Sequence, residues 1–173
     1  TAVHTDTAGT ITLSTGGVAG AGDIQIVEAQ ALNTSRVVLA TDGSEQLVSI
    51  TSTAGGITVD GNLGNSTDDL ILIATAGDIE GGAGTLTAND LTLDASAGGI
   101  GLLTPVSTNT SGTLTLISGA AAGLGNISVS EVNALATSRL SVATDVSEQL
   151  VTLASAGTFT VDAGLGNATD DLS

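Results

Sequence analysis

The stretch SRVVLATDGSEQLVSITSTAGGITVDGNLGNSTDD, at residues 35–69, decides the fold because it occurs twice. It returns one residue shorter at residues 138–171, as SRLSVATDVSEQLVTLASAGTFTVDAGLGNATDD. The likeness extends backwards, since TAVHTDTAGTITLSTGGVAGAG at residues 1–22 matches TPVSTNTSGTLTLISGAAAGLG at residues 104–125. The chain therefore divides into one 103-residue unit (1–103) and a partial second copy (104–173), and we expect it to be an excerpt of a longer array.

Comparison of the two copies separates inward from outward positions without any homologue. Val37 and Leu39 stay aliphatic in the second copy, whereas Val38 between them becomes Ser141. This alternation predicts a strand with one buried face. The same reasoning predicts strands at residues 10–13, 24–27, 36–41, 46–52 and 57–61. The apolar pattern beyond residue 69, which the second copy hardly covers, predicts a strand at residues 70–75 and inward positions at Ile79, Leu86, Leu91, Leu93 and Ile100. The second copy lacks one residue of the segment 52–56, which predicts a turn there; residues 28–34 and 62–69 are also expected to be turns.

The composition favours a narrow core. Hydrophobic residues make up 41% of the chain, but Phe159 is the only aromatic residue and Trp, Tyr and Met are absent. The core must therefore be filled by Ile, Leu, Val and Ala, and 24 glycines suit many tight turns. We predict an all-β, right-handed parallel β-helix (β-solenoid) with about five coils of about 20 residues in each unit. Tandem β-sandwich domains remain the alternative, because the unit is as long as an immunoglobulin domain. The second unit is expected to continue the first, since no linker separates Leu103 from Thr104.

The charge excludes several classes of partner. The chain carries 18 acidic residues against two arginines, for a net charge of −16. Nucleic-acid binding needs a basic surface, and anionic membrane surfaces are disfavoured for the same reason. No apolar run approaches the roughly 20 residues that span a bilayer, so no membrane insertion is expected. The absence of cysteine excludes disulfides and thiolate metal sites.

Several segments resemble a known family. TAGDIEGGAGTLTANDLTLDASAGGIG (75–101) looks like the glycine-rich repeats of filamentous-haemagglutinin-like bacterial exoproteins. GAGDIQIVEAQAL (20–32) and GNSTDDLILIATAGDI (64–79) resemble stretches of very large β-strand-repeat adhesins of Gram-negative bacteria. The resemblance covers most of the chain, but it is a similarity of repeat pattern and composition and includes no catalytic or metal-binding motif. It implies a right-handed parallel β-helix, export to the cell surface, and assembly into fibres, sheaths or adhesive stalks. The 103-residue period and the acidity are not general features of the family.

The paired carboxylates Asp68–Asp69 and Asp170–Asp171 are the candidate metal ligands. Carboxylate oxygens suit Ca²⁺, and a carboxylate pair could also serve a glycosidase. The structural interpretation is a turn in which these side chains cap backbone amides, and we favour it. The chain contains no calcium-binding motif, and a polysaccharide-cleaving groove would need more basic residues. We therefore expect no catalytic or cofactor-binding residue and no enzyme activity, with calcium as the only candidate cofactor.

Three further features have plain structural interpretations. Arg36 and Arg139 recur at fixed distances from Glu28 and Glu131 and from the second pair of glutamates, Glu45 and Glu148, which predicts a structural ion pair between adjacent turns. His4 becomes serine in the second copy and is expected to face solvent. The Thr-x-Thr pairs could suggest an ice-binding face, but outward threonine is common in strands.

These observations predict a structural segment of a long extracellular bacterial fibre, sheath or adhesin stalk. Self-association end to end or laterally is expected, since open solenoid ends expose unpaired strands. The alternative is a calcium- or glycan-binding adhesive repeat module that contacts glycans or a host or cell surface.

Overall fold

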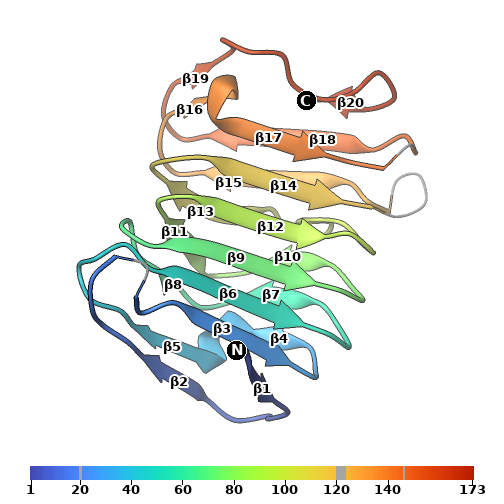
Figure 1. Cartoon of the computed structure of the whole chain (residues 1–173). Coiled ribbons are helices and arrows are strands. Elements are labelled where there is room, and N and C mark those ends of the chain that lie inside the picture. The colour runs from blue at the N-terminus through green and yellow to red at the C-terminus, as the bar shows by residue number, and fades with distance from the viewer. Residues whose placement is uncertain (20, 120–123, 146) are drawn as a thin grey trace.

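The computed structural model describes residues 1–19, 21–119, 124–145 and 147–173. The chain winds around one axis as a parallel β-solenoid of about seven turns. In Figure 1 the strands of the front sheet run from left to right while the chain climbs from the N-terminus at the bottom, so the coil is right-handed. The described residues contain two short 3₁₀ turns, η1 (Thr34–Arg36) and η2 (Thr137–Arg139), and no α-helix. The prediction of a β-solenoid is confirmed, and the β-sandwich alternative does not apply.

All the strand pairings are parallel, and each joins a strand to one in the coil below or above it. The front, seven-stranded sheet is formed by β1 (Val3–Thr5), β3 (Ile24–Glu28), β6 (Leu47–Ser52), β9 (Asp69–Ala74), β12 (Leu91–Ala95), β14 (Leu114–Ser118) and β17 (Leu140–Ala143). A six-stranded sheet is formed by β8 (Leu63–Gly64), β11 (Thr85–Ala88), β13 (Val106–Thr110), β15 (Ile127–Glu131), β18 (Leu150–Ser155) and β20 (Asp171–Leu172). The remaining strands form a three-stranded sheet and two pairs: β4 (Leu32–Asn33), β7 (Ile57–Val59) and β10 (Ile79–Gly81); β2 (Ile11–Ser14) with β5 (Val37–Ala40); and β16 (Leu135–Ala136) with β19 (Phe159–Thr160).

The strand register stacks like on like. Along the seven-stranded sheet Ile26 pairs with Ile50, Ile50 with Leu72, and Leu72 in turn lies opposite Leu93. Each step in this register advances the chain by one coil, for example from Leu70 to Leu91 or from Leu114 to Leu140. Stacked aliphatic side chains keep a constant cross-section, which explains why a core of Ile, Leu, Val and Ala is sufficient.

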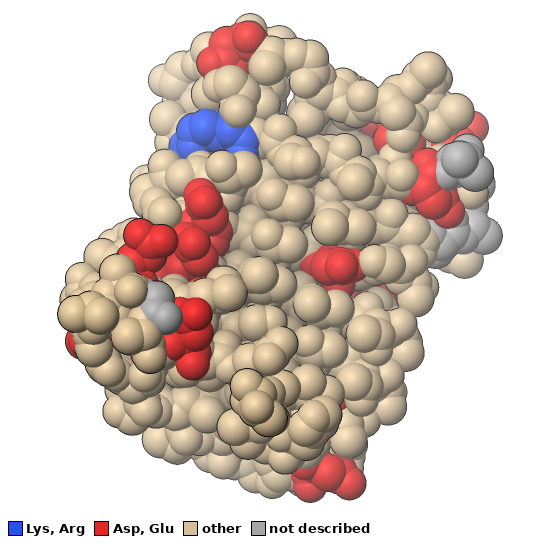
Figure 2. All heavy atoms as spheres, in the orientation of Figure 1, with Lys and Arg blue, Asp and Glu red and all other residues tan. Residues whose placement is uncertain are grey.

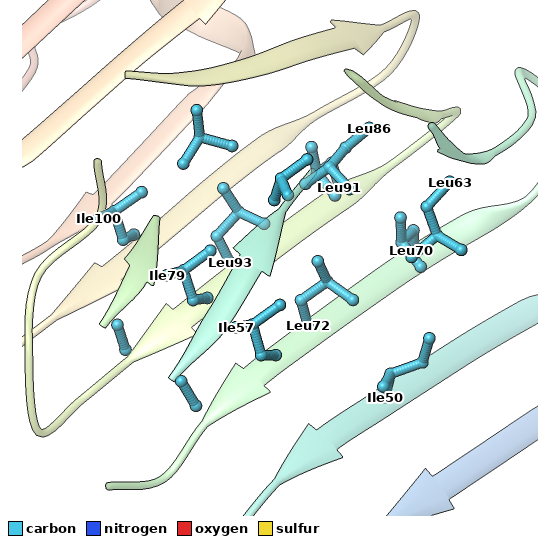
Figure 3. Packing of buried hydrophobic residues seen from close by; sticks show 14 of the residues in the cluster. Ile50, Ile57, Leu63, Leu70, Leu72, Ile79, Leu86, Leu91, Leu93 and Ile100 are labelled. Carbon is cyan, nitrogen blue, oxygen red and sulfur yellow. The ribbon is translucent and has the colours of Figure 1, made fainter. Parts of the chain in front are cut away.

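The core is a continuous aliphatic column between the sheets (Figure 3). All five predicted inward residues are completely buried: Ile79, Leu86, Leu91, Leu93 and Ile100. The side chain of Val38 is 48% exposed, as its replacement by serine in the second copy predicted. The column passes the junction of the two units without interruption, because β12 pairs with β14 and Ile100 bridges Ile79 and Ile127.

Two segments predicted to be turns contain short strands. Within residues 62–69, β8 pairs with β11, and Leu63 is only 3% exposed. Within residues 28–34, β4 pairs with β7, and Leu32 is 1% exposed. Each of these strands has two residues, so a single apolar side chain provides the whole inward face. Alternation cannot be recognised over so short a length. The turn expected within residues 52–56 is present, since β6 ends at Ser52.

Candidate functional sites

The first carboxylate pair lies at the corner of the coil where β9 begins, with Asp68 before the strand and Asp69 as its first residue. Asp68 is buried, and its two carboxylate oxygens accept hydrogen bonds from the backbone N–H of Gln46 (3.2 Å) and from Nδ2 of Asn65 (2.7 Å). Asp69 is half-buried and accepts from the backbone N–H of Asp90 at 3.1 Å. Consecutive residues of a strand point to opposite faces, so the two carboxylates do not converge on one point. This pair caps backbone amides, as the turn interpretation predicted.

The second pair occupies the same corner of the second copy. Asp170 accepts a hydrogen bond from the hydroxyl of Thr144 at 2.6 Å through Oδ2, while its Oδ1 is buried without a hydrogen-bond partner. Asp171 is exposed, and its backbone N–H donates to the carbonyl of Gln149. Across the described part of the chain, no three acidic or histidine side chains come together as a metal-binding group. The candidate residues Asp68, Asp69, Asp170 and Asp171 are therefore not assembled into such a group.

Most other acidic side chains serve the same purpose at the corners. Asp23 accepts from the backbone N–H of Leu47, Asp78 from that of Gly99, and Asp90 from that of Thr113. In each case the amide belongs to the next coil, 21 to 24 residues further on. Asn126 in the second copy replaces Asp23 and accepts from the backbone N–H of Leu150. Asp23, Asp78 and Asn126 belong to a Gly-Asp/Asn-Ile pattern that recurs at residues 22–24, 77–79 and 125–127. The pattern joins neighbouring coils, because backbone amides at the corners need acceptors.

Hydrogen bonds lower the pKa of three of these carboxyl groups. The backbone N–H groups of Gly17 and Ser44 hold the pKa of Asp42 below its usual value. The hydroxyl and the backbone N–H of Ser138 do the same for the pKa of Asp162. Burial raises the pKa of Asp60, the counterpart of Asp162, but hydrogen bonds from Ser35 outweigh it, so that the pKa is lowered overall. A lowered pKa means that these hydrogen bonds stabilise the ionised form of the carboxyl group in the folded chain.

Glu28 and its counterpart Glu131 are completely buried, which the sequence did not indicate. Glu131 is completely buried and accepts hydrogen bonds from the hydroxyls of Thr108 (2.9 Å) and Thr110 (2.7 Å). It also accepts from the backbone N–H groups of Thr110 (3.0 Å) and Asn133 (3.2 Å). Glu28 repeats the arrangement in the first copy, with Thr5 as one of its donors. Four donors around one carboxylate offset the cost of removing it from water.

The arginines bind the same turn from its other side, and the predicted ion pair with glutamate is wrong. The guanidinium of Arg139 donates to the carbonyl oxygens of Thr110 (2.8 Å), Gly112 (2.6 Å) and Ala134 (3.1 Å). Arg36 makes the same contacts in the first copy, where its guanidinium donates to the carbonyl oxygens of Gly9, Ala31 and Thr7. The glutamate therefore accepts hydrogen bonds from backbone amides of the turn, and the arginine donates to its backbone carbonyls. The constant spacing of glutamate and arginine in the sequence could not show that both side chains bind the backbone and not each other.

Two other surface features are the side chain of His4 and an apolar hollow at the last coil. His4 is exposed on β1, as expected from its replacement in the second copy. An apolar hollow lies at the last coil, lined by residues that include Phe159, Val161 and Leu172. Their counterparts in the first copy, Ile57, Val59 and Leu70, are buried because the next coil covers them. The hollow is therefore the inside of a coil that no further coil covers in this structure.

Comparisons with protein-family models, with curated proteins and with solved structures gave no match to this chain. Among the described residues, no helix has the length and apolar character to cross a bilayer. The fold therefore stands on the structure itself, and no family is assigned.

Proposed function

We propose that this chain is a structural segment of a long extracellular bacterial fibre, sheath or adhesin stalk. Its role is to provide length, stiffness and a repetitive surface, without enzymatic activity. The bacterial and extracellular parts of the proposal come from the resemblance to haemagglutinin-like exoproteins. The mechanical part comes from the solenoid, whose coils contact only their neighbours and can be added without a change in cross-section.

The observation that carries the proposal is the unbroken ladder across the two units. The β12–β14 pairing and the Ile79–Ile100–Ile127 bridges cross the junction between Leu103 and Thr104. A linker would allow the two units to move independently, whereas a shared ladder makes them one rod. At a strand spacing of about 4.8 Å, each coil lengthens the rod by that amount. Length in such a molecule grows in proportion to the number of residues.

The distribution of polar groups also supports a scaffold. The acidic side chains at the corners accept amides of the adjacent coil, and both arginines are engaged with backbone carbonyls. The chain contains no lysine, so Arg36 and Arg139 are its only potential cleavage sites for trypsin-like proteases. Each arginine is the last residue of a 3₁₀ turn, and its guanidinium donates to a backbone carbonyl of the neighbouring coil, Gly9 or Gly112. Resistance to proteolysis suits a surface fibre.

Self-association belongs to the same proposal. Self-association would stack the end of one solenoid on the end of another, as one coil stacks on the next. Unpaired strand groups at a solenoid end favour stacking of this kind. End-to-end contact between solenoids is therefore the expected mode, with lateral packing as the second.

The test has two parts. A protein with several tandem 103-residue units should form unbranched rods in electron microscopy whose length increases by about 22 Å per unit, given about 4.5 coils per unit at the strand spacing above. Antibodies against the chain should label intact cells of the source organism before permeabilisation. Beads on a string would contradict the mechanical role, and labelling only after permeabilisation would contradict the extracellular one.

A further inference from the structure

The two copies are not related by a simple shift along the solenoid axis. From Ile24, four register steps along the seven-stranded sheet lead through Val48, Leu70 and Leu91 to Leu114. Ile127, the counterpart of Ile24, lies midway in the sequence between Leu114 and the next rung of that sheet, Leu140. One unit of 103 residues therefore spans about four and a half coils, where the sequence alone predicted about five.

The half coil makes corresponding strands change sheets. β3 and β6 belong to the seven-stranded sheet, whereas their counterparts β15 and β18 belong to the six-stranded sheet. The opposite change also occurs. β2 and β5 form a pair outside the seven-stranded sheet, whereas their counterparts β14 and β17 belong to that sheet. The second copy is therefore turned by about half a revolution around the axis with respect to the first.

The exposed loops change edges for the same reason. The loop of residues 41–46 enters the seven-stranded sheet, because β6 follows it. Its counterpart in the second copy connects β17 of the seven-stranded sheet to β18 of the six-stranded sheet, and Val146 within it lies outside the described residues. Both loops expose a glutamate, Glu45 and Glu148, and both are followed by an exposed leucine. Figure 2 shows acidic side chains gathered at both the left and the right edge of the molecule.

We infer that the 103-residue repeat makes this solenoid a two-sided display scaffold. The surface loop that one copy presents along one edge is presented by the next copy along the opposite edge. A repeat of a whole number of coils would instead align all these loops on one edge.

This inference rests on the proposed role as a scaffold, but its geometry can be tested separately. The chain has no cysteine, so two substitutions create two unique attachment points. In the variant Glu45→Cys/Glu148→Cys, biotin is coupled to the corresponding loops of the two copies. In the control variant Glu45→Cys/Ser111→Cys, biotin is coupled to two loops of the same edge, since Ser111 lies directly before β14. Along the sheet these control sites are three coils apart, about 14 Å.

Streptavidin tetramers serve as the probe, and their positions are read by electron microscopy of the full chain. For the Glu45/Glu148 variant we expect two tetramers on opposite sides of the solenoid. For the Glu45/Ser111 control we expect tetramers on one side only, and only one per chain because neighbours exclude each other at that spacing. Tetramers on the same side in the Glu45/Glu148 variant would overturn the inference. Failure of the cell-surface labelling described above would overturn the extracellular role without moving the tetramers.

Discussion

At the scale of single residues, Glu131 carries a buried charge that only its hydrogen bonds make tolerable. Glu131→Gln replaces one acceptor oxygen by an amino group that then faces donors of Thr108 or Thr110. We expect the free energy of unfolding to fall by about 1–3 kcal/mol, measured by urea denaturation. Glu148→Gln is the matched control, because it removes the same charge from an exposed position and should change stability by less than about 0.5 kcal/mol. Equal losses in both variants would contradict the role given to Glu131.

The carboxylates with lowered pKa make stability depend on pH in a defined direction. Because the pKa of Asp162 is lower in the folded than in the unfolded chain, its contribution is fully present above the unfolded value of about 4. It is lost as the pH falls through the folded pKa. Asp162→Asn should therefore lower the melting temperature at pH 7, and the difference from the native chain should shrink below pH 4. A difference that stays constant between pH 7 and pH 3 would refute this assignment.

Calcium is expected to have no specific effect on the folded chain. Both carboxylate oxygens of Asp68 already accept hydrogen bonds, and no three acidic or histidine side chains come together among the described residues. After chelation, added calcium should therefore shift the melting temperature no more than sodium chloride of equal ionic strength. A saturable rise in melting temperature would instead show binding to the folded state and would favour the adhesive-module alternative.

At the scale of elements, strands have fixed register whereas corners tolerate changes in length. Ala54 is exposed in the corner after β6, where the second copy lacks one residue. Deletion of Ala54 should leave a cooperative unfolding transition with a small loss of stability, measured by circular dichroism. Deletion of Ser49 within β6 shifts Ile50 from the buried to the exposed face and should abolish that transition. A similar effect of both deletions would show that the corner is as constrained as the strand.

The strands that could be predicted show an apolar or alternating pattern over several residues, and for those before residue 70 the two copies add a comparison. Val38 and its counterpart Ser141 identify an outward position, and with it the face of the whole strand. Leu63 is the only apolar residue of β8 with a side chain, because Gly64 follows it, so no alternation could be recognised. The sequence therefore predicted a turn there, although Leu63 is buried. The partners of Arg139 were also inaccessible, because backbone carbonyls carry no sequence signal. The acidic corners were predicted to cap amides, and the structure shows which amides of the next coil they take.

At the scale of the whole molecule, the half coil in each unit follows from coil lengths that the sequence does not reveal. The register steps vary from 21 residues, between Leu70 and Leu91, to 26 residues, between Leu114 and Leu140. Insertions at corners produce this variation, and their sum over a unit decides whether equivalent surfaces align or alternate. A change of about half a coil in one unit would convert a two-sided scaffold into a one-sided one. The length of the repeat is therefore a structural property in its own right.

The uncovered last coil provides a direct test of stacking as the source of stability. Phe159, Val161 and Leu172 are 41%, 77% and 52% exposed, whereas the next coil buries their counterparts in the first copy. Adding a second copy of residues 71–93 after Leu172 should bury these side chains and raise the melting temperature by at least about 4 °C, since each buried side chain contributes about 1–3 kcal/mol. The control extension carries asparagine in place of the copies of Leu72, Ile79, Leu86, Leu91 and Leu93, so that it has the same length with most of its apolar inward face removed. We expect no rise with the control, because stability in a solenoid comes from the interface between neighbouring coils. An equal rise with both extensions would show that chain length, and not burial of the last coil, sets the stability of the rod.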